Sequence, residues 1–350
     1  MRKRKYFICK AKSYDPYENL AYEDALARFV RNSSGDGDDV VEGLYLWQSD
    51  NAIIFGRNQS VYKECDLQVV EEKNIKLVRR DSGGGAVYQD LGNLNYSFFC
   101  VKNSSRNNIE CIIGALEKFG IRAVISGRND LVVDGKKISG TAFRAAGNVE
   151  MQHGTLLIEE DLELADKCLK PGPQKLCRKG VDSVRSRIMN INELVDLNVD
   201  DVIYAIEQEF ISRHNNWDKI IATIDKYHYI LNLNRLRSKK WIYRDEIKEC
   251  GCKTISGPWG TLSYQIVIEE GCIKSVWFDT DTMNADFWDM VFEKLTGMEF
   301  AAGSLRNCEE QLSKGRAEEE KGMIATLMQD LFLDMEHESA FENTPGCIRE

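Results

Sequence analysis

The segment Arg79-Arg80-Asp81-Ser82-Gly83-Gly84-Gly85-Ala86-Val87 (RRDSGGGAV) is the most informative stretch of this 350-residue chain. Strand-like segments flank it, at Ile75–Val78 and near Ala86–Tyr88. Three consecutive glycines let a backbone approach a ligand closely and turn successive N–H groups toward an anion. The two arginines add permanently charged partners for a phosphate. A glycine-rich bend with surface arginines is the alternative interpretation, and the segment matches neither GxxxxGK[ST] nor GxGxxG.

Strand-like segments cluster around this turn and do not alternate regularly with helices. Leu44–Trp47 and Ala52–Phe55 indicate a hairpin, and Asp134-Gly135 is a tight-turn signal between the strand Leu131–Val133 and a return strand from Lys136. This grouping favours an α+β fold with a mixed, largely antiparallel sheet and flanking helices. We expect helices at the following places: after the Asp15 N-cap and Pro16, near Leu67–Lys73, over 109–119, near Val199–His214, near Ala285–Leu295 and over Glu309–Met335.

The length predicts two domains, because single hydrophobic cores seldom grow beyond about 250–300 residues. The polar, basic segment Asn232–Lys240 is interpreted as a connector. Beyond it, Leu262–Ile268 and Cys272–Phe278 form a second strand set, separated by a turn at Glu270-Gly271. We therefore expect domains over residues 1–243 and 244–350, the second a small α+β accessory domain.

The composition argues against several classes of protein, although it leaves room for a local basic site. The chain carries 46 Lys and Arg against 56 Asp and Glu, a net charge of −10, whereas a general nucleic-acid binder needs a basic face. The basic start MRKRKYFICK lacks a signal-peptide core, and no apolar run is long enough to cross a membrane. Eleven cysteines without paired CxxC motifs and only four histidines argue against a structural metal. We expect a cytoplasmic monomer that binds neither nucleic acid nor membrane.

The segment Gly127–Gly140 (GRNDLVVDGKKISG) carries a second set of charged residues. The tight turn returns Lys136 and Lys137 beside the strand that bears Asn129 and Asp130. A lysine held there can neutralise a phosphate or carboxylate, and a nearby carboxylate can bind a divalent ion. If faces alternate here, only one of the two lysines points inward, and periodicity does not decide which. Solvated lysines on a hairpin are the alternative.

Two further polar segments and the cysteines have structural interpretations. His153, in QHGTLLI, is more simply a hydrogen-bonded structural residue than a ligand, and SVRSR (183–187) resembles a salt-bridged strand edge. Cys65, Cys100 and Cys111 have no histidine nearby in sequence. Cys100 falls in an apolar strand and is interpreted as a buried thiol.

Together these segments resemble the lipoate-protein ligase family. The resemblance rests on RRDSGGGAVYQDLGNLNYSF (79–98), GRNDLVVDGKKISGTAFR (127–144), QHGTLL (152–157) and SVRSR (183–187), with NLAYED (19–24) and LYLWQSDNAIIFGRNQ (44–59) before them. From Trp241, the segment WGTLSYQIVIEEG resembles the accessory domain of bacterial two-domain ligases. The resemblance implies a class II synthetase/biotin-ligase-like catalytic domain.

The resemblance also implies a two-step reaction and a set of site residues. Lipoate is activated by ATP with Mg²⁺, as a substrate complex, to lipoyl-AMP with release of pyrophosphate, and the lipoyl group then passes to a lysine of an acceptor. Lipoyl domains of 2-oxoacid dehydrogenase acyltransferase subunits and the glycine-cleavage H protein are the implied acceptors. The implied residues are Lys137 as the central catalytic lysine, Arg80 with Gly85, Ala86, Val87 and Tyr88 for ATP, Ser82 and Arg144 for lipoate, and Asp130 for Mg²⁺.

One departure and two alternatives accompany the resemblance. Gln89 stands where the family usually has histidine, so this position cannot change its protonation state. A carrier-dependent octanoyl or lipoyl transferase of the same fold would need a reactive cysteine at the acyl pocket, and the strand and SGTAFR segments around Lys137 carry none. A non-catalytic relative that only binds acceptors is the other alternative, which the presence of Arg80 and Lys137 disfavours.

Overall fold

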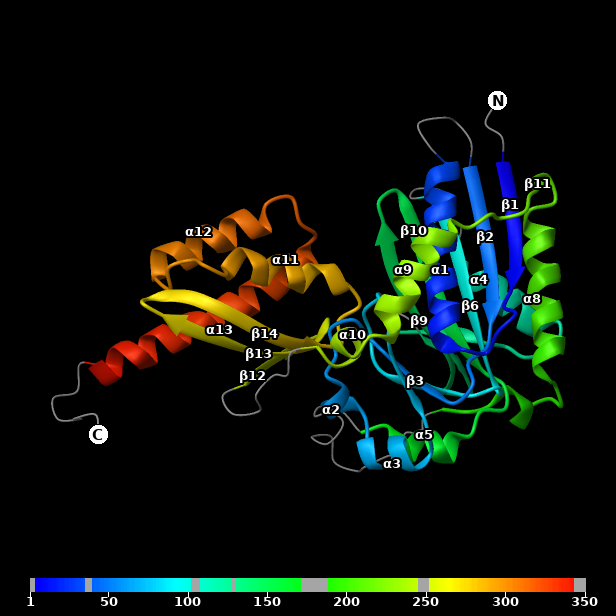
Figure 1. Ribbon diagram of the computed structural model, residues 1–350, viewed down its shortest axis with the longest axis horizontal. Coiled ribbons are helices and arrows are strands. Elements are labelled where there is room, and N and C mark those ends of the chain that lie inside the picture. The colour runs from blue at the N-terminus through cyan, green and yellow to red at the C-terminus, as the bar shows by residue number, and fades with distance from the viewer. Residues whose placement is uncertain are drawn as a thin grey trace. The chain divides into compact units, whose positions relative to one another are not determined.

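The computed structural model describes residues 4–34, 40–101, 108–127, 130–170, 188–244 and 252–342. The chain divides into two compact units, Met1–Arg244 and Asp245–Glu350 (Figure 1). Each unit has its own sheet, helices and core, so the predicted α+β class is confirmed. Within these described ranges, no helix combines the length and apolarity needed to span a membrane.

An eight-stranded mixed sheet forms the centre of the first unit (Figure 1). Its two pairs at one edge, β11–β1 and β1–β2, are parallel, and the other five pairs are antiparallel. In spatial order the strands are β11 (Asp218–Lys219), β1 (Arg4–Lys10), β2 (Val40–Trp47), β6 (Asn93–Val101), β10 (Val149–Leu157), β9 (Lys136–Ala146), β8 (Asp130–Val133) and β7 (Val124–Ser126).

Helices cover both faces of this sheet, because its strands bury apolar side chains on each side. Helices α4 (Ile109–Glu117) and α8 (Val199–Arg213) pack on one face with Leu46, Phe98 and Leu156. Helix α1 (Pro16–Ser33) and helix α9 (Lys226–Arg237) share a second core with Tyr45, Phe99 and Met151. The expected start of α1 is confirmed, since the carboxylate of Asp15 accepts hydrogen bonds from the N–H groups of Tyr17 and Glu18.

A small three-stranded sheet carries the glycine turn. Its order is β4 (Lys76–Arg79), β3 (Ala52–Phe55) and β5 (Val87–Gln89), with β3–β4 parallel and β3–β5 antiparallel. The predicted hairpin of Leu44–Trp47 with Ala52–Phe55 is therefore wrong, because β2 and β3 belong to different sheets. Both strands are buried, and their continuous apolar runs do not reveal which neighbour each pairs with. Short helices α2 (Val61–Glu64), α3 (Leu67–Glu72) and α5 (Leu162–Cys168) lie in the same unit.

The tight turn predicted at Asp134-Gly135 is confirmed. The two residues have φ values of 50° and 79°, which is the left-handed conformation that such a hairpin turn requires. The predicted connector Asn232–Lys240 is wrong, because α9 and α10 (Lys239–Tyr243) occupy it. Asp225 caps α9, and Leu233 and Leu236 pack in the core shared with α1, so polar composition concealed a helix that is packed on one side.

Over its described residues, 252–342, the second unit consists of a three-stranded antiparallel sheet with three helices. Strands β12 (Lys253–Gly257), β13 (Gly260–Glu269) and β14 (Cys272–Thr280) form a meander, and Glu270 and Gly271 make the predicted turn. Helix α11 (Ala285–Leu295) was predicted, whereas the single helical stretch expected over Glu309–Met335 is two helices, α12 (Ala302–Ser313) and α13 (Glu318–Glu342). Gly315, with φ of 74°, lies between them. The buried Trp288 and Leu327 belong to the core of this unit.

Candidate functional site

The strand register places the polar residues of the first unit on one face of the large sheet. Asn95 of β6 lies beside Thr155 of β10, which lies beside Gly140 of β9, which lies beside Asp130 of β8. A parallel row, two residues along, contains Ser97, His153 and Ala142. Side chains two residues apart on a strand point to the same face. The two rows therefore bring segments that are far apart in the sequence onto one surface.

Lys137 lies over the first row. Its Nζ is 2.8 Å from Oδ1 of Asp130, and the two side chains are 34% and 33% exposed. A Cβ atom built on Gly140 would stand 2.8 Å from the same Nζ, so this glycine leaves the space that the amine occupies. The exposed Lys136 lines a separate cavity of about 400 Å³ with Glu160 and Asn190. Among the described residues, Lys137 is therefore the one of the two lysines that forms an ion pair with Asp130.

Arg80 organises the glycine turn from inside. The residue is 7% exposed, and its guanidinium donates hydrogen bonds to the carbonyl groups of Gly83, Gly85 and Ile54 and to Oγ of Ser82. Burial lowers the pKa of Arg80 to about 10, which still leaves it charged at neutral pH. Arg80 therefore binds the turn itself, and its polar atoms face the protein.

The backbone N–H groups of the turn are left free as a result. Within the described parts of the chain, the N–H groups of Gly83, Gly84, Gly85 and Ala86 have no hydrogen-bond acceptor. Gly84 has φ of 87°, and a Cβ on the exposed Gly85 would meet nothing within 4 Å. Arg80 binds the carbonyl oxygens of the turn on the inner side. The successive N–H groups of the turn are therefore left available to an anion. Gly56 allows strand β3 to approach, since a Cβ there would stand 2.2 Å from the carbonyl oxygen of Gly84.

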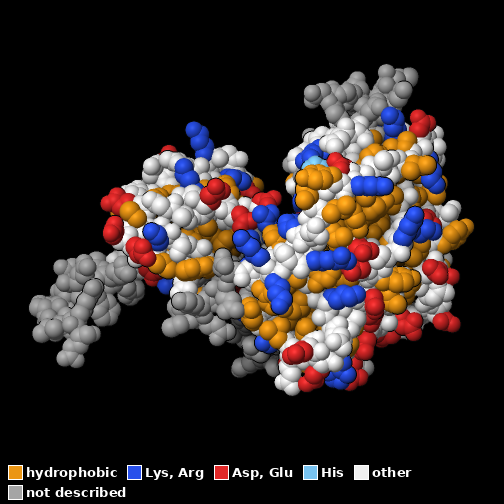
Figure 2. All heavy atoms as spheres, in the orientation of Figure 1, with side chains coloured by type: hydrophobic (Ala, Val, Ile, Leu, Met, Phe, Trp, Pro, Cys, Tyr) orange, Lys and Arg blue, Asp and Glu red, His pale blue; other side chains and the backbone are white. Residues whose placement is uncertain are grey.

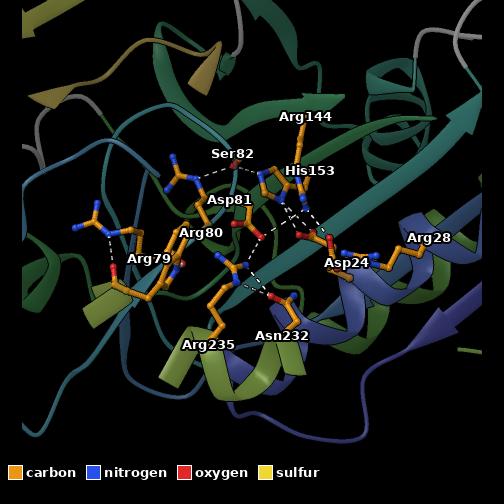
Figure 3. Close-up of polar contacts among 12 residues, drawn as sticks. Asp24, Arg28, Arg79, Arg80, Asp81, Ser82, Arg144, His153, Asn232 and Arg235 are labelled. Atoms are coloured by element: carbon orange, nitrogen blue, oxygen red, sulfur yellow. Dashed lines mark hydrogen bonds and ion pairs between the residues drawn. The ribbon is translucent and has the colours of Figure 1, made fainter. Parts of the chain in front are cut away.

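Ser82 belongs to a buried hydrogen-bonded chain that reaches Glu23 on α1, which also accepts a hydrogen bond from Ser97 of β6. Oγ of Ser82 is 2.7 Å from Nε2 of His153 (Figure 3). Nδ1 of His153 is 3.0 Å from Oε1 of Glu23. A carboxylate next to Nδ1 favours a proton on that nitrogen, so Nε2 accepts the hydroxyl proton of Ser82. Ser82 also accepts a hydrogen bond from Arg80. The position and hydrogen-bonding direction of the Ser82 hydroxyl are thereby set by residues of two other elements.

Arg144 belongs to a network of alternating charges. Its Nη1 lies 2.8 Å from Oδ1 of Asp24 and 3.6 Å from Oδ2 of Asp81, and Asp81 also pairs with Arg235 of α9 at 2.7 Å (Figure 3). Burial alone would lower the pKa of Arg144, but Asp81 and Asp24 outweigh it and raise the pKa. Burial would likewise raise the pKa of Asp24, and Arg144 with Arg28 lowers it. Arg144 is thus charged and neutralised within the protein.

Gln89 forms a reciprocal amide pair with Asn95. Nε2 of Gln89 donates to Oδ1 of Asn95 at 2.8 Å, and Nδ2 of Asn95 donates to Oε1 of Gln89 at 3.0 Å. Both residues are buried. The two hydrogen bonds fix Asn95 at the end of the first polar row, and neither partner titrates. This position therefore has a structural role that an amide pair fulfils.

Sequence reasoning missed Glu23, Asp24 and Arg235. Glu23 lies on the same buried face of α1 as Leu20 and Ala27. It follows Leu20 by three residues and precedes Ala27 by four, which is helical spacing. A carboxylate at an apolar position of an amphipathic helix was the signal, because such a group needs a partner. His153, interpreted as structural, is hydrogen-bonded as expected and lies within the site. Arg128, Asn129 and the segment 183–187 lie outside the described residues.

Comparison with known proteins shows which family of proteins shares this sheet and this glycine turn. A family model described as the lipoyl protein ligase A/B catalytic domain matches residues 15–211, and one described as the bacterial lipoate protein ligase C-terminus matches residues 253–326. Lipoate-protein ligase A of Blochmanniella floridana is 30% identical over 314 residues, which are 86% of this chain and 91% of that protein.

Two solved structures share the fold. The crystal structure of P. falciparum LipL1 in complex with lipoate has a TM-score of 0.78 at 22% identity and covers 93% of this chain and 99% of its own. The bi-partite lipoate protein ligase of Thermoplasma acidophilum, studied with its E2 lipoyl domain, has a TM-score of 0.58 at 25% identity and covers 71% of this chain and 100% of its own. The chain belongs to the lipoate-protein ligase family, so the predicted enzyme class, a ligase, is confirmed.

Proposed function

We propose that this ligase activates free lipoate with Mg-ATP and transfers the lipoyl group from lipoyl-AMP to a lysine of an acceptor protein. The observation that carries the proposal is the set of four free backbone N–H groups of Gly83–Ala86, held open by Arg80. Such a cradle suits the phosphate oxygens of a nucleotide. It lies beside Ser82, which contacts His153 on the same sheet face as the position occupied by Lys137.

In the first step, two anions must approach each other. A carboxylate oxygen of lipoate attacks the α-phosphorus, and the bond from that phosphorus to the oxygen bridging to the β-phosphorus breaks, so pyrophosphate leaves with its electron pair. Lys137 is the proposed catalytic residue, because its ammonium can neutralise oxygens of both reactants in the crowded reacting centre. Arg80 acts in this step through the turn, by positioning the free N–H groups of Gly85 and Ala86 for the nucleotide. Val87 and Tyr88 follow in β5, whose pairing with β3 holds the end of the turn in place.

Asp130 is the proposed partner that Lys137 leaves when substrate binds. Mg²⁺ enters as part of the ATP complex, and magnesium in such complexes takes one or two protein carboxylates together with phosphate oxygens. The carboxylate of Asp130, one-third exposed and held by a single lysine among the described residues, fits that use. When the Lys137 ammonium moves from Asp130 to the substrate oxygens, Mg²⁺ takes its place beside the Asp130 carboxylate. Each charge therefore has a partner of opposite sign before and after substrate binding.

Ser82 and Arg144 are proposed for the lipoyl side of the site with different roles. Ser82 offers a fixed hydroxyl at the edge of the turn, since Arg80 and His153 hold it. Arg144 is already paired with Asp24, so it acts by holding Asp81 and α1 in place. In the second step the neutral amine of the acceptor lysine attacks the lipoyl carbonyl, and the acyl–phosphate bond breaks with release of AMP.

Lipoyl domains of 2-oxoacid dehydrogenase acyltransferase subunits and the glycine-cleavage H protein are the proposed acceptors. The support is the T. acidophilum ligase, which was studied with an E2 lipoyl domain. We place the enzyme in the cytoplasm. Cys65, Cys100, Cys111 and Cys168 are buried free thiols there, and burial raises the pKa of each to about 12. Thiols so rarely deprotonated also argue against the carrier-dependent transferase.

The test is incubation of the enzyme with Mg-ATP, lipoate and a purified lipoyl domain, followed by intact mass measurement of the acceptor. We expect one added lipoyl group per acceptor lysine, and none when ATP or lipoate is omitted. Lipoate-dependent exchange of labelled pyrophosphate into ATP isolates the first step. Modification from an acyl carrier protein without ATP would contradict the proposal and favour the transferase.

A further inference from the structure

The outward face of helix α9 carries apolar side chains that the site does not use. Tyr227, Ile230 and Leu231 are 68%, 53% and 49% exposed, and their spacing places them on one face of the helix. The opposite face packs Tyr229, Leu233 and Leu236 against the core shared with α1. A solvent-facing surface helix is ordinarily polar on its outer side. Contiguous exposed apolar side chains with a charged surround are typical of binding surfaces.

The charge of this segment is opposite to that of the chain. Residues 226–244 contain six Lys and Arg and no Asp or Glu, a formal charge of +6. Because the whole chain has a net charge of −10, the remainder carries −16. Lys226, Lys239 and Lys240 are exposed and pair with no carboxylate of the described residues. Figure 2 shows basic and apolar side chains side by side over this part of the first unit.

The same segment is joined to the glycine turn. Nη2 of Arg235 lies 2.7 Å from Oδ2 of Asp81, and the Arg235 guanidinium lies 4.0 Å from the centre of the Trp241 ring. Trp241 in turn donates a hydrogen bond from Nε1 to the carbonyl oxygen of Arg79. We name as the α9 face the exposed residues Lys226, Tyr227, Ile230 and Leu231 of α9 together with Lys239 and Lys240 of the following helix α10. These two helices also contact the candidate site, through Arg235 and Trp241.

We propose that the α9 face docks the acceptor protein, and that its partner is an acidic surface with a small apolar patch close to the target lysine. The inference rests on the proposed function, because a ligase that modifies a protein has to hold the folded acceptor next to its active site. Arg235 and Arg237 of this segment are already paired with carboxylates of the first unit, so the attraction comes mainly from the three lysines that pair with no carboxylate of the described residues. They attract an acidic partner that the net negative charge of the remaining chain repels, which steers its approach. Exposed Ile230 and Leu231 add apolar contact that suits a folded protein surface. Of the six residues of the α9 face only Tyr227 is aromatic, whereas a surface that binds single-stranded nucleic acid stacks successive bases on several rings.

The test compares two variants with two matched controls. The double variant Tyr227→Ala/Ile230→Ser removes apolar contact area. The double variant Lys239→Glu/Lys240→Glu reverses the charge, and its two carboxylates lie in the first turn of α10, where the helix dipole stabilises negative charge. Tyr204→Ala on α8 is the apolar control, because Tyr204 is 64% exposed. Lys73→Glu/Lys219→Glu is the charge control, since both lysines are exposed elsewhere on the first unit. Each protein is assayed for lipoate-dependent pyrophosphate exchange without acceptor, and for lipoylation of a purified lipoyl domain at low and high salt.

We expect both α9 variants to keep pyrophosphate exchange within twofold of the parent enzyme. Their kcat/KM for the acceptor should fall at least tenfold, through KM, and the charge variant should lose most of the salt dependence of the parent. Acceptor kinetics equal to those of the controls would overturn the α9 face. If a variant lost pyrophosphate exchange to the same extent as lipoylation, the substitution would have damaged the enzyme itself, and the docking proposal would be overturned as well.

Failure of the proposed function gives a different result, namely no exchange or no lipoylation by the parent enzyme. That outcome overturns both proposals, whereas normal parent activity with unaffected variants overturns the docking face alone. Binding of a DNA duplex or of phosphatidylglycerol vesicles is measured for the same proteins. If the α9 variants lose that binding but retain parent acceptor kinetics, the face belongs to another partner and the proposal is wrong.

Discussion

Arg80 and Lys137 are two cations that the sequence assigns to one reaction, but the structure surrounds them differently. Arg80 is 7% exposed and bonds to three carbonyl groups and one hydroxyl of its own protein. Lys137 has a side chain that is 34% exposed, and it pairs with a single carboxylate within the described residues. The planar fork of arginine suits several fixed acceptors, whereas the point charge of lysine can change partner. One cation therefore holds the glycine turn in shape, and the other is the one that we propose meets the substrates.

The largest effect that tests this contrast is expected from Lys137→Ala. Removing the ammonium should reduce lipoate-dependent pyrophosphate exchange by about 10³-fold, roughly 4 kcal/mol of transition-state stabilisation. The free energy of unfolding should change little, because the side chain is partly exposed and its ion pair is worth at most about 1 kcal/mol. Urea unfolding measured beside the exchange assay checks both statements.

Lys136→Ala is the matched control for that variant. Lys136 is the neighbouring lysine of the same strand, is exposed and makes no contact with Asp130. It should keep exchange within a few-fold of the parent enzyme. Normal exchange by Lys137→Ala would remove the catalytic assignment, and an equal loss in the two variants would end the distinction between the lysines.

Arg80→Met is expected to act on stability first. The substitution keeps the length of the chain but leaves the carbonyl groups of Gly83, Gly85 and Ile54 without their donor. Unpaired buried polar groups cost about 1–3 kcal/mol each before relaxation, so we expect a loss of about 3 kcal/mol in the free energy of unfolding. Unfolding in urea measures this loss. A stable Arg80→Met protein whose only defect is a raised KM for ATP would show that Arg80 binds nucleotide directly.

Much of the fold could be predicted because local signals agreed with it. Asp134-Gly135 fixed a hairpin through φ values that few residues adopt, and Asp15-Pro16 marked the start of α1. The β2–β3 hairpin was wrong because two buried apolar strands carry no information on their partners. Helix α9 was missed because its outer side is basic and apolar, which masks the periodicity of its packed side.

The site was predicted less completely than the fold. The residues of RRDSGGGAV and GKK are local in sequence, and the resemblance located them. The direction in which each side chain points is set by packing, so nothing local showed that Arg80 turns inward or that Arg144 pairs with Asp24. The Ser82–His153–Glu23 chain joins residues from three distant segments, and only the packing of the glycine turn and of α1 against β10 brings them together.

Glu23→Gln tests the buried chain behind Ser82. The amide removes the charge that keeps the proton on Nδ1 of His153, so Nε2 no longer accepts reliably from Ser82. We expect KM for lipoate to rise about tenfold, which corresponds to about 1.4 kcal/mol, with a smaller change in kcat. Steady-state pyrophosphate exchange at varied lipoate concentration separates the two constants.

A second buried histidine–carboxylate pair provides the control. His214 lies 2.9 Å from Glu42, and both side chains are buried between α8 and β2. Glu42→Gln makes the same chemical change away from the site and should leave KM for lipoate unaltered. A similar rise in KM in both variants would assign the effect to stability and would contradict a positioning role for Glu23.

Glu160 gives the smallest expected effect, and it sharpens the contrast between buried groups that have partners and those that lack them. Its side chain is buried, and Oε2 has no hydrogen-bond partner among the described residues. Burial, with Asp90 and Asp161 nearby, raises the pKa of Glu160 well above its usual value.

The folded state therefore binds a proton that the unfolded chain releases above pH 4.5. The free energy of unfolding falls as pH rises from 4.5 through the pKa of Glu160 in the folded protein. Glu160→Gln should raise the free energy of unfolding by about 1 kcal/mol at pH 7–8 and change it little at pH 4. Urea unfolding across this pH range measures the difference, and a variant curve parallel to that of the parent would contradict it.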